Sequence, residues 1–484
     1  MQSTSQTQNR KLEGYDLYKA LGSPKLIVAP MVDQSELAFR RLTRRYGAQL
    51  VYTPMINAKM FADTTHKYYR EQYFDIASGE EGASSLSCGD TDRPLIVQFC
   101  ANSPEHLLAS AKLVEAHCDA VDINLGCPQE IARRGHYGAF LMDEWDLIFN
   151  MINNLHKNLT IPVTAKFRVF PEIEKTVAYA QMLERAGAQI LTCHGRTREQ
   201  RGQNSGLASY AHIRAVKAAV RVPVFANGNI LFSGDVERCL AETGADAVMS
   251  AEGVLYNPAL FNGLPDCASF VSPDTPSEVS TSTSTSTTSE SSPAGPRTEP
   301  PSSSELPLET TNPPLAPLAL EYLAIVRSQR TRTSPSAVKG HLFKILRPAL
   351  AQPAYHDLRE RLGRVRAVAP RRLGEKDKEK DGEEATEQWV WVDEYVRICE
   401  EARGRLEEDA RRMTEDGRIP LRELVAKDAA TGLDVLPYWL AQPYFRPLKA
   451  PVDKKKRKEA VDTQNGVPGE SEPKRAKLDG EVVA

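Results

Sequence analysis

Short apolar runs rich in β-branched residues alternate with amphipathic stretches between Leu21 and about Asp266. Runs of this kind predict buried strands, and apolar residues spaced at i, i+3 and i+4 predict helices between them. About eight strands are expected, in runs that begin at Lys25, Leu50, Pro94, Ala120, Pro162, Ile190, Pro223 and Ala245. This number of strand and helix repeats over about 250 residues predicts an α/β fold of the (β/α)8 TIM barrel type for residues 21–266.

A doubly wound parallel sheet is the competing fold. Neither a GxGxxG after the first strand nor a GxxxxGK[ST] is present in the chain. Dinucleotide-binding and P-loop versions of that fold carry these glycine-rich turns. The barrel is therefore preferred.

Composition changes divide the rest of the chain. Residues 267–317 are rich in Ser, Thr and Pro and predict a disordered linker. Residues 318–447 repeat the helical spacing and predict a small all-helical domain, with a charged insertion near residues 374–387. The polar ends, residues 1–20 and 448–484, are expected to be disordered tails.

Charge and cysteine content exclude several classes of protein. The 61 Lys and Arg against 64 Asp and Glu give a net charge of −3, so no global basic field marks a nucleic-acid binder. The eight cysteines form no CxxC pair, which argues against a zinc finger, any other metal site or a disulfide scaffold. No apolar run reaches the roughly 18 residues of a membrane helix, so no membrane association is expected.

A local basic surface is predicted in the helical domain, where few acidic residues interrupt the sequence. A solvated helix face and a phosphate-binding surface both explain such a stretch. Its first members are Lys339, His341, Lys344 and Arg347.

Polar residues follow the apolar runs, at the strand ends where barrels place their working groups. Cys127 is the best candidate for chemistry among the cysteines, because Gly126 and Pro128 predict a turn that exposes the thiol. A thiol with an ordinary pKa near 8.5 is mostly protonated at neutral pH and can act as a general acid. Cys100 and Cys193 lie inside apolar strands and are expected to be inert.

Two adjacent turns follow the last two strands and combine small residues with backbone amides, Asn227-Gly228-Asn229 and Ala251-Glu252-Gly253. Barrels commonly bind a phosphate at this place, and the phosphate of flavin mononucleotide (FMN) fits there. An inward-facing Lys166 and the amide of Gln98 suit the pyrimidine edge of a flavin. His194 is either an orienting residue or a core histidine.

The segments APMVDQSELAFR, VDINLGCPQEIARRGHYGAFL, KFRV, CHGRTREQRG, FANGNI and MSAEGVLYNPALF resemble the tRNA-dihydrouridine synthases in order and spacing. CPQ…RGHYGAFL, AEGVLYNP, SAVKGHLFK and WLAQPYFRP are most similar to the eukaryotic branch that acts on uridines 16 and 17 of the tRNA D-loop. The resemblance covers the barrel and the helical domain.

This resemblance implies an FMN enzyme that reduces uridine in tRNA with electrons from NADPH or NADH. It implies that Cys127 donates the proton to C5 after hydride reaches C6, and that Asn124 and Arg168 contact the target uracil. It implies FMN contacts from Pro30, Met31, Val32, Gln98, Lys166, His194, Asn227, Gly228, Asn229, Ala251 and Glu252. The cationic helical domain would hold the RNA backbone.

Two other classes of function stay open. An FMN barrel acting on a free small molecule would turn over without RNA, and a non-catalytic tRNA-binding factor would not need Cys127. We expect a monomer, although no motif sets the oligomeric state. Two basic clusters, residues 454–458 and 474–477, resemble a bipartite nuclear import signal, so we expect both a nuclear and a cytoplasmic location.

Overall fold

The computed structural model describes residues 11–84, 91–202, 206–264, 306–366 and 390–444. These residues fall within one compact unit. The charged insertion, most of the predicted linker and the predicted C-terminal tail with its basic clusters lie outside the described residues.

Eight parallel strands form a closed barrel, because β2 pairs with both β1 and β4 and so joins the two ends of the sheet. The remaining strands follow in chain order back to β9, which pairs with β1. The strands are β1 Leu26–Val28, β2 Leu50–Tyr52, β4 Leu95–Cys100, β5 Ala120–Leu125, β6 Val163–Arg168, β7 Leu191–His194, β8 Val224–Asn227 and β9 Ala247–Ser250. The predicted TIM barrel is confirmed, and each strand lies in one of the predicted apolar runs.

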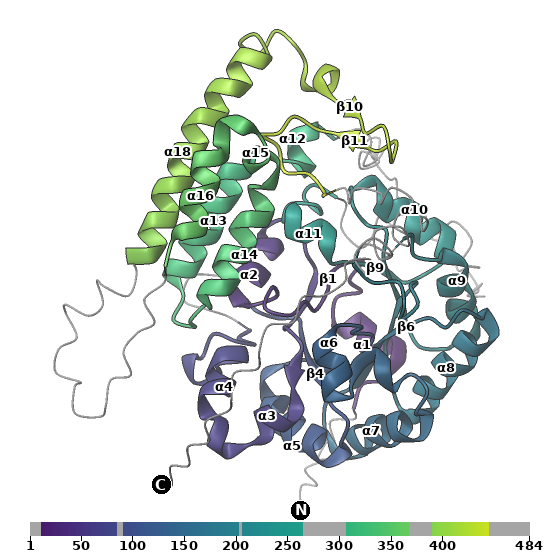
Figure 1. Cartoon of the computed structure of the whole chain (residues 1–484). Coiled ribbons are helices and arrows are strands. Elements are labelled where there is room, and N and C mark those ends of the chain that lie inside the picture. The colour runs from purple at the N-terminus through teal and green to yellow at the C-terminus, as the bar shows by residue number, and fades with distance from the viewer. Residues whose placement is uncertain (1–10, 85–90, 203–205, 265–305, 367–389, 445–484) are drawn as a thin grey trace, which may run out of the picture. The chain divides into compact units, whose positions relative to one another are not determined.

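Amphipathic helices surround the barrel strands (Figure 1). A short strand, β3 Ile56–Asn57, pairs with the end of β4. The helices of this part are α2 Leu37–Arg45, α3 Ala58–Ala62, α4 Lys67–Tyr73, α5 Pro104–Val114, α6 Glu130–Gly135, α7 Trp145–Asn158, α8 Ile173–Ala186, α9 Tyr210–Ala219, α10 Gly234–Thr243 and α11 Glu252–Tyr256. Their buried apolar residues join those of the strands in one continuous core.

The prediction that residues 1–20 are a disordered tail is wrong for its second half. Helix α1 (Gly14–Ala20) buries Leu17 and Tyr18 with residues of the barrel interior. The Tyr18 hydroxyl donates to the carbonyl of Asp246 at 2.9 Å. Residues from the amino ends of the strands, such as Leu50 and Ala247, belong to the same apolar cluster, so α1 covers that end of the barrel.

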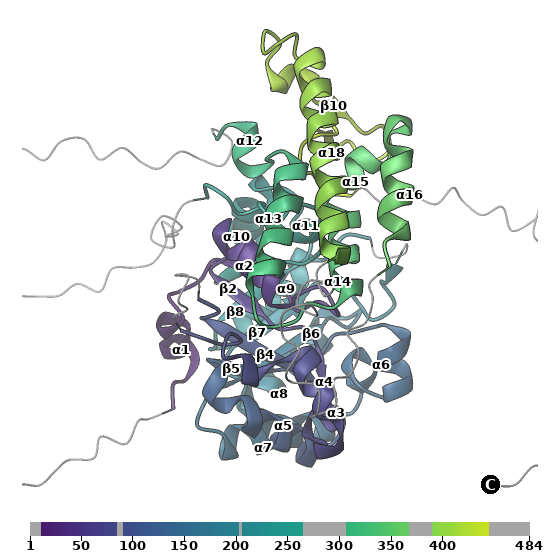
Figure 2. The same ribbon diagram turned by 90° about the vertical axis from the view of Figure 1, so that its left-hand side faces the viewer.

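The second part of the chain is helical, as predicted, and packs on the barrel (Figures 1 and 2). It contains α12 Leu308–Thr311, α13 Leu315–Ser328, α14 Pro335–Ile345, α15 Arg347–Leu350, α16 His356–Arg364 and α18 Val390–Met413. Helix α13 packs on α2 and on α18, and α14 packs on α11. A hairpin of β10 (Ala426–Lys427) and β11 (Asp434–Val435) adds two short strands to this part.

The predicted linker ends earlier than its composition suggested. Residues 306–317 belong to the folded part, because Thr311 and Asn312 are buried and accept hydrogen bonds from Asn257 of the barrel. Residues 313–315 also bond to the chain near Trp439 and Ala441. Within the described residues, every helix is too short or too polar to cross a lipid bilayer.

Candidate active site

The carboxyl ends of β5 to β8 place the predicted site residues in neighbouring positions. The register pairs Asn124 with Lys166, Arg168 with His194, and His194 with Asn227. Residues separated by up to about 100 positions in the chain therefore meet at one end of the barrel, as parallel strand ends must.

A buried hydrogen-bond network supports this end of the barrel. Asp122 accepts from the hydroxyl of Thr164 at 2.6 Å and from Nε2 of Gln98 at 2.7 Å. Oε1 of Gln98 in turn accepts from Nδ2 of Asn124 at 2.7 Å. Burial raises the pKa of Asp122 to about 6, against the two hydrogen bonds that favour its charged form.

Gln98 is completely buried, and both the nitrogen and the oxygen of its side-chain amide are hydrogen-bonded within the protein. It lies in the wall of the site and orients Asn124. Sequence reasoning missed Asp122 and Thr164, although a carboxylate inside the apolar run AVDINL is the kind of signal that marks a buried network.

Asn124 holds the turn that carries Cys127. Its Oδ1 accepts from the backbone N–H of Gly126 at 3.1 Å and of Cys127 at 2.9 Å. Gly138 packs on the other side, where an added Cβ would lie 2.8 Å from the Cys127 carbonyl. The thiol is partly exposed, as predicted, and burial raises its pKa above the ordinary value, so it is protonated at neutral pH.

Lys166 brings an unneutralised positive charge into the site. Its Nζ donates to Oδ1 of Asn227 at 2.7 Å, and no carboxylate of the described residues forms an ion pair with it. Burial and the neighbouring Arg168 lower the pKa of Lys166 to about 8. Nδ2 of Asn227 donates to the carbonyl of Met249 at 2.8 Å, which fixes the amide so that its oxygen faces the lysine.

Arg168 forms hydrogen bonds with two of the loops near Lys166. Its Nε donates to the carbonyl of Gly126 at 2.7 Å, and its Nη1 donates to the carbonyls of Thr197 and Gln200. Burial and Arg196 lower the pKa of Arg168 to about 10. Arg168 therefore connects the Cys127 turn to the loop after β7.

His194 is held as a neutral imidazole. Burial, with Lys166, Arg168 and Arg196 nearby, lowers its pKa well below the ordinary value. Its Nε2 lies 3.0 Å from Nη1 of Arg196. Because a guanidinium can only donate hydrogen bonds, Nε2 is the acceptor and the ring proton is assigned to Nδ1. The structure leaves His194 partly exposed at the strand end and not in the apolar core.

The two predicted turns lie against each other. Asn229 adopts a left-handed conformation with φ of 62°, and its amide bonds to Ala208 in both directions. Gly253 follows Ala251 and Glu252, and an added Cβ there would lie 2.4 Å from the carbonyl of Ile230. The hydroxyl of Ser250 donates to that same carbonyl. Only glycine permits this approach of the loops after β8 and β9.

The loop after β1, with Pro30, Met31 and Val32, is folded around Ser35. The Ser35 hydroxyl accepts from the Met31 N–H at 2.7 Å and donates to the carbonyl of Ala29 at 3.2 Å. All three residues of the loop are partly exposed at the barrel end.

The prediction that His341 belongs to a phosphate-binding surface is wrong. Its side chain is completely buried between helices, stacked on Phe39 at a centroid distance of 4.2 Å, and its Nε2 lies 3.0 Å from Oε2 of Glu36. The other oxygen of Glu36 accepts from the Tyr322 hydroxyl at 2.7 Å. Burial alone would raise the pKa of Glu36, but His341 and Tyr322 outweigh it and hold that pKa below its usual value.

The other basic residues of α14 and its end differ in exposure. Lys344 donates to Oε1 of Gln34 at 2.6 Å, so it connects α14 to the loop after β1. Lys339 donates to the carbonyls of Gly363 and Val365 at the end of α16. Arg347 is exposed.

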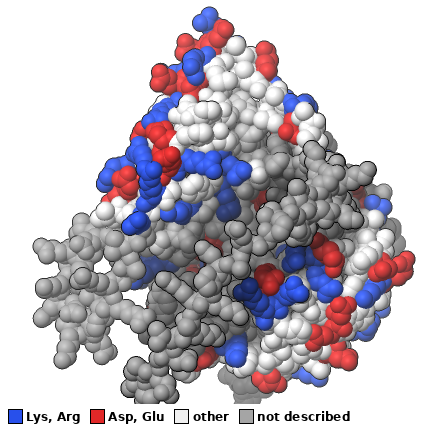
Figure 3. Space-filling view, in the orientation of Figure 1, with Lys and Arg blue, Asp and Glu red and all other residues white. Residues whose placement is uncertain are grey.

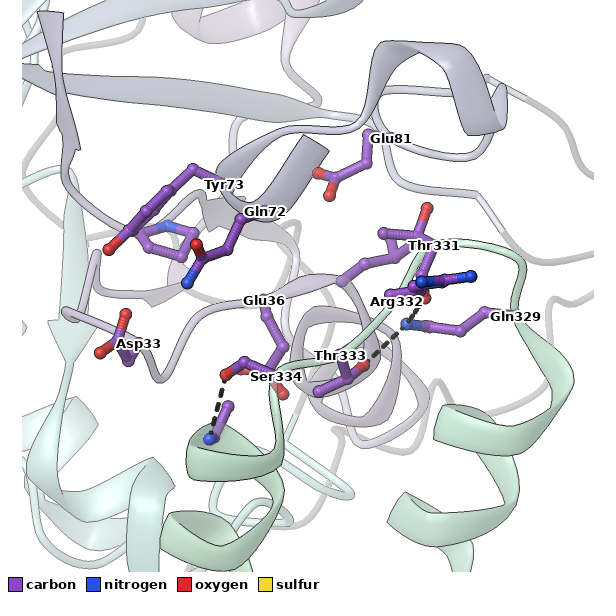
Figure 4. Close-up of a pocket in the computed structure, with 13 residues that line it drawn as sticks. Asp33, Glu36, Gln72, Tyr73, Glu81, Gln329, Thr331, Arg332, Thr333 and Ser334 are labelled. Carbon is purple, nitrogen blue, oxygen red and sulfur yellow. Dashed lines mark hydrogen bonds between the residues drawn. The ribbon is translucent and has the colours of Figure 1, made fainter. Parts of the chain in front are cut away.

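A pocket separates the loop after β1 from the start of α14 (Figure 4). Asp33, Tyr73 and Gln72 line it from the barrel, and Thr331 and Ser334 line it from the helical part. Burial, with Glu36 nearby, raises the pKa of Asp33. Within the described residues, no three His, Cys, Asp or Glu side chains are grouped closely enough to hold a metal ion.

Sequence similarity to known proteins covers the barrel and extends into the helical part. Residues 27–284 match the dihydrouridine synthase family. The NAD(P)+ tRNA-dihydrouridine(16/17) synthase of Saccharomyces cerevisiae is 42% identical over 93% of this chain and 90% of its own length. Its counterpart from Schizosaccharomyces pombe is 39% identical over 95% of this chain and 97% of its own length. A human tRNA-dihydrouridine(20a/20b) synthase-like protein is 35% identical over 54% of this chain and 77% of its own length.

Proposed function

This chain belongs to the dihydrouridine synthase family, and from that membership we propose that it reduces uridine to 5,6-dihydrouridine at positions 16 and 17 of the tRNA D-loop. The reductant is NADPH or NADH. The observation that carries the proposal is the protonated, partly exposed thiol of Cys127 on a turn fixed by Asn124, next to the unpaired cation of Lys166.

The choice of positions 16 and 17 rests on the extent of similarity. The two fungal relatives named for these positions match over 93% and 95% of this chain, whereas the human relative named for 20a and 20b matches over 54%. The helical part is therefore shared with the first two, and a part that contacts RNA outside the barrel is suited to set which uridine reaches the thiol.

The residues at the barrel end fit FMN. Lys166 forms no ion pair with a described carboxylate, and burial lowers its pKa although Asp122 acts in the opposite direction. The pyrimidine edge of a reduced flavin would supply a further negative charge beside it. The turns at Asn227-Gly228-Asn229 and Ala251-Glu252 pack against each other after β8 and β9, the strands beside which barrels commonly bind phosphate. We assign the flavin contacts to these residues, with His194 and the loop Pro30, Met31 and Val32, while the buried Gln98 supports the site through Asn124.

Bound FMN would supply the hydride that reduces C6 of the uracil ring. The chain's own part is to place the base and to deliver the proton. Cys127 gives its thiol proton to C5 and regains one from water, so that uridine, NAD(P)H and one proton become dihydrouridine and NAD(P)+. Asn124 and Arg168 hold the Cys127 turn at its amide and carbonyl groups, and one N–H of the Asn124 amide is left over for the uracil.

The target base must leave its stack to reach the thiol, which costs a few kcal/mol and less in a loop than in a duplex. Contacts to the RNA backbone offset this cost. Figure 3 shows basic side chains over the helical part and a second group over the barrel face near α6, with acidic side chains among both. Exposed cations such as Arg347 and Arg359 are suited to such contacts.

The test is mass spectrometry of unmodified tRNA after incubation with the purified protein, FMN and NADPH. We expect a gain of two hydrogens at uridines 16 and 17, and a loss of at least a hundredfold in rate for Cys127→Ala with tRNA binding retained. Reduction without any change in Cys127→Ala would refute the role of the thiol. NADPH consumption with no gain in tRNA would instead favour a reductase of small molecules.

We also propose that the protein is a monomer present in both nucleus and cytoplasm. Light scattering and imaging of a fluorescent fusion test these points. Replacing the lysines of residues 454–458 and 474–477 should move the fusion out of the nucleus if these clusters are import signals.

A further inference from the structure

Three side chains from distant parts of the chain form a stack beside the barrel opening. The guanidinium carbon of Arg347 lies 3.6 Å from the ring centroid of Tyr444. The Tyr444 ring lies 5.5 Å from that of Tyr256, with the two planes tilted by 35°. We propose that this stack, hereafter the Arg347 platform, binds an unpaired nucleotide of the tRNA substrate. The inference rests on the proposed function and adds a second RNA contact to it.

The platform borders the path into the site. Tyr256 ends α11, the helix that begins at Glu252 in the turn assigned to FMN. Arg347 begins α15, one turn after Lys344, which contacts Gln34 of the loop after β1. Helix α11 lies between the barrel and the helices of the second part (Figure 1). An RNA that spans both parts while one base enters the barrel passes this place.

No described carboxylate compensates the charge of Arg347. It is exposed and forms no ion pair with any described residue. Several neighbouring arginines of the helical part are instead paired with carboxylates, as Arg361 is with Glu401, Arg405 with Asp357 and Arg412 with Asp409. A cation without such a partner is available for an external anion.

The geometry favours a nucleotide over a simple anion. The guanidinium carbon of Arg347 lies 3.6 Å from the Tyr444 ring centroid, which is stacking distance, and the residue is exposed. A guanidinium plane stacks on an unpaired base, and its edge N–H groups donate to phosphate. Every nucleobase has a stacking face, so the platform recognises an unstacked nucleotide and not a particular sequence.

The platform is also rigid, which lowers the entropy lost on binding. Residues 313–315 bond to the chain near Trp439 and Ala441, just before Tyr444. The buried amide of Gln442 bonds to the backbone of Leu436 in both directions. Next to Tyr256, Nδ2 of Asn257 donates to the carbonyl of Thr311 at 2.6 Å.

The experiment compares tRNA affinity and turnover of the full chain with those of Arg347→Ala, Arg347→Lys, Tyr444→Ala and Tyr444→Phe. Arg221→Ala is the matched control, because Arg221 is exposed in the loop before β8, at the opposite end of the barrel. The probe is an unmodified tRNA transcript carrying the D-loop. Each variant's FMN content is measured from its absorbance spectrum, which should not change.

We expect Arg347→Ala to weaken binding about tenfold or more, the magnitude of one lost base stack. Arg347→Lys should lose nearly as much, since lysine keeps the charge but has no plane. Tyr444→Ala should weaken binding about fivefold and Tyr444→Phe less than twofold. The variants should raise KM for tRNA, while kcat at saturating tRNA stays within twofold of the wild-type value, because the platform does not touch the reacting atoms.

Three results would overturn the proposal. Wild-type affinity in Arg347→Lys would make Arg347 a point contact to phosphate, and wild-type affinity in every variant would make the stack a surface feature with no RNA contact. Equal loss in Arg221→Ala would show only a non-specific charge effect. If the wild-type protein binds and reduces tRNA in the same assay, these results refute the platform alone; if it does neither, the proposed function fails as well.

Discussion

Replacing Lys166 with methionine should make the flavin-free protein more stable, although it removes a residue of the candidate site. The pKa of Lys166 is lowered from 10.5 to about 8 by burial and by Arg168. Since each tenfold change in proton affinity is worth about 1.4 kcal/mol, keeping this lysine charged costs about 3 kcal/mol at pH 7. The variant also loses the bond to Asn227, worth about 1 kcal/mol, so the expected net gain is about 2 kcal/mol.

The pH dependence identifies the cause. Between the lowered folded pKa near 8 and the unfolded value of 10.5, the unfolded chain binds the proton that the folded protein has released. The wild-type protein therefore gains stability as pH rises through this window, and the methionine variant does not. The stability difference between the two should fall from about 2 kcal/mol at pH 7 to near zero at pH 10.

Urea unfolding of flavin-free protein at pH 7 and pH 10 measures this difference. Lys217→Met is a matched control, because Lys217 is also partly buried but bonds to Asp246 at 2.7 Å, and its pKa is raised, against the effect of burial. That variant should be less stable than wild type by about 1–3 kcal/mol at pH 7. A Lys166→Met protein that is less stable than wild type at pH 7, or a difference that does not change with pH, would refute the reasoning.

Three further outcomes follow from the same contacts. FMN affinity, measured by flavin fluorescence, should fall about tenfold from pH 7.5 to 9.5 as Lys166 loses its charge. This pH dependence should be absent in Lys166→Arg. The same pH dependence in that variant would mean that a group other than Lys166 titrates. His341→Ala should cost about 2–4 kcal/mol in urea unfolding, since it removes the hydrogen-bond partner of the Glu36 carboxylate and leaves a cavity beside Phe39, while His341→Gln should recover part of the loss. A cost below about 1 kcal/mol would show that this contact does not hold α14 to the barrel. Leu17→Ala should cost about 2–4 kcal/mol with an unchanged flavin spectrum, because α1 covers the end of the barrel opposite the site; full stability would show that α1 is not needed there.

Local patterns along the chain were enough to predict the barrel and much of its opening. A buried strand and an amphipathic helix are each defined by the spacing of apolar residues over about ten positions, so the eight strands and the main helices could be recognised from the sequence. The exposed turn at Cys127 and the paired glycine turns at Gly228 and Gly253 were also recognisable, because turn residues act within three or four positions. The resemblance then added roles that no spacing encodes.

Contacts between distant segments could not be predicted in this way. Helical spacing places His341 on a face of α14 but does not show that this face meets Glu36, 305 residues earlier, so a buried structural residue was predicted to bind phosphate. The same limit hid α1 beneath the barrel, the Asp122 network behind Gln98, and the stack of Arg347 on Tyr444. The sequence by itself determined which segments form buried strands, amphipathic helices and turns, because those preferences are local. Only the tertiary structure decided which polar groups pair, because a buried polar group needs a hydrogen-bond partner and the fold determines which group lies within reach.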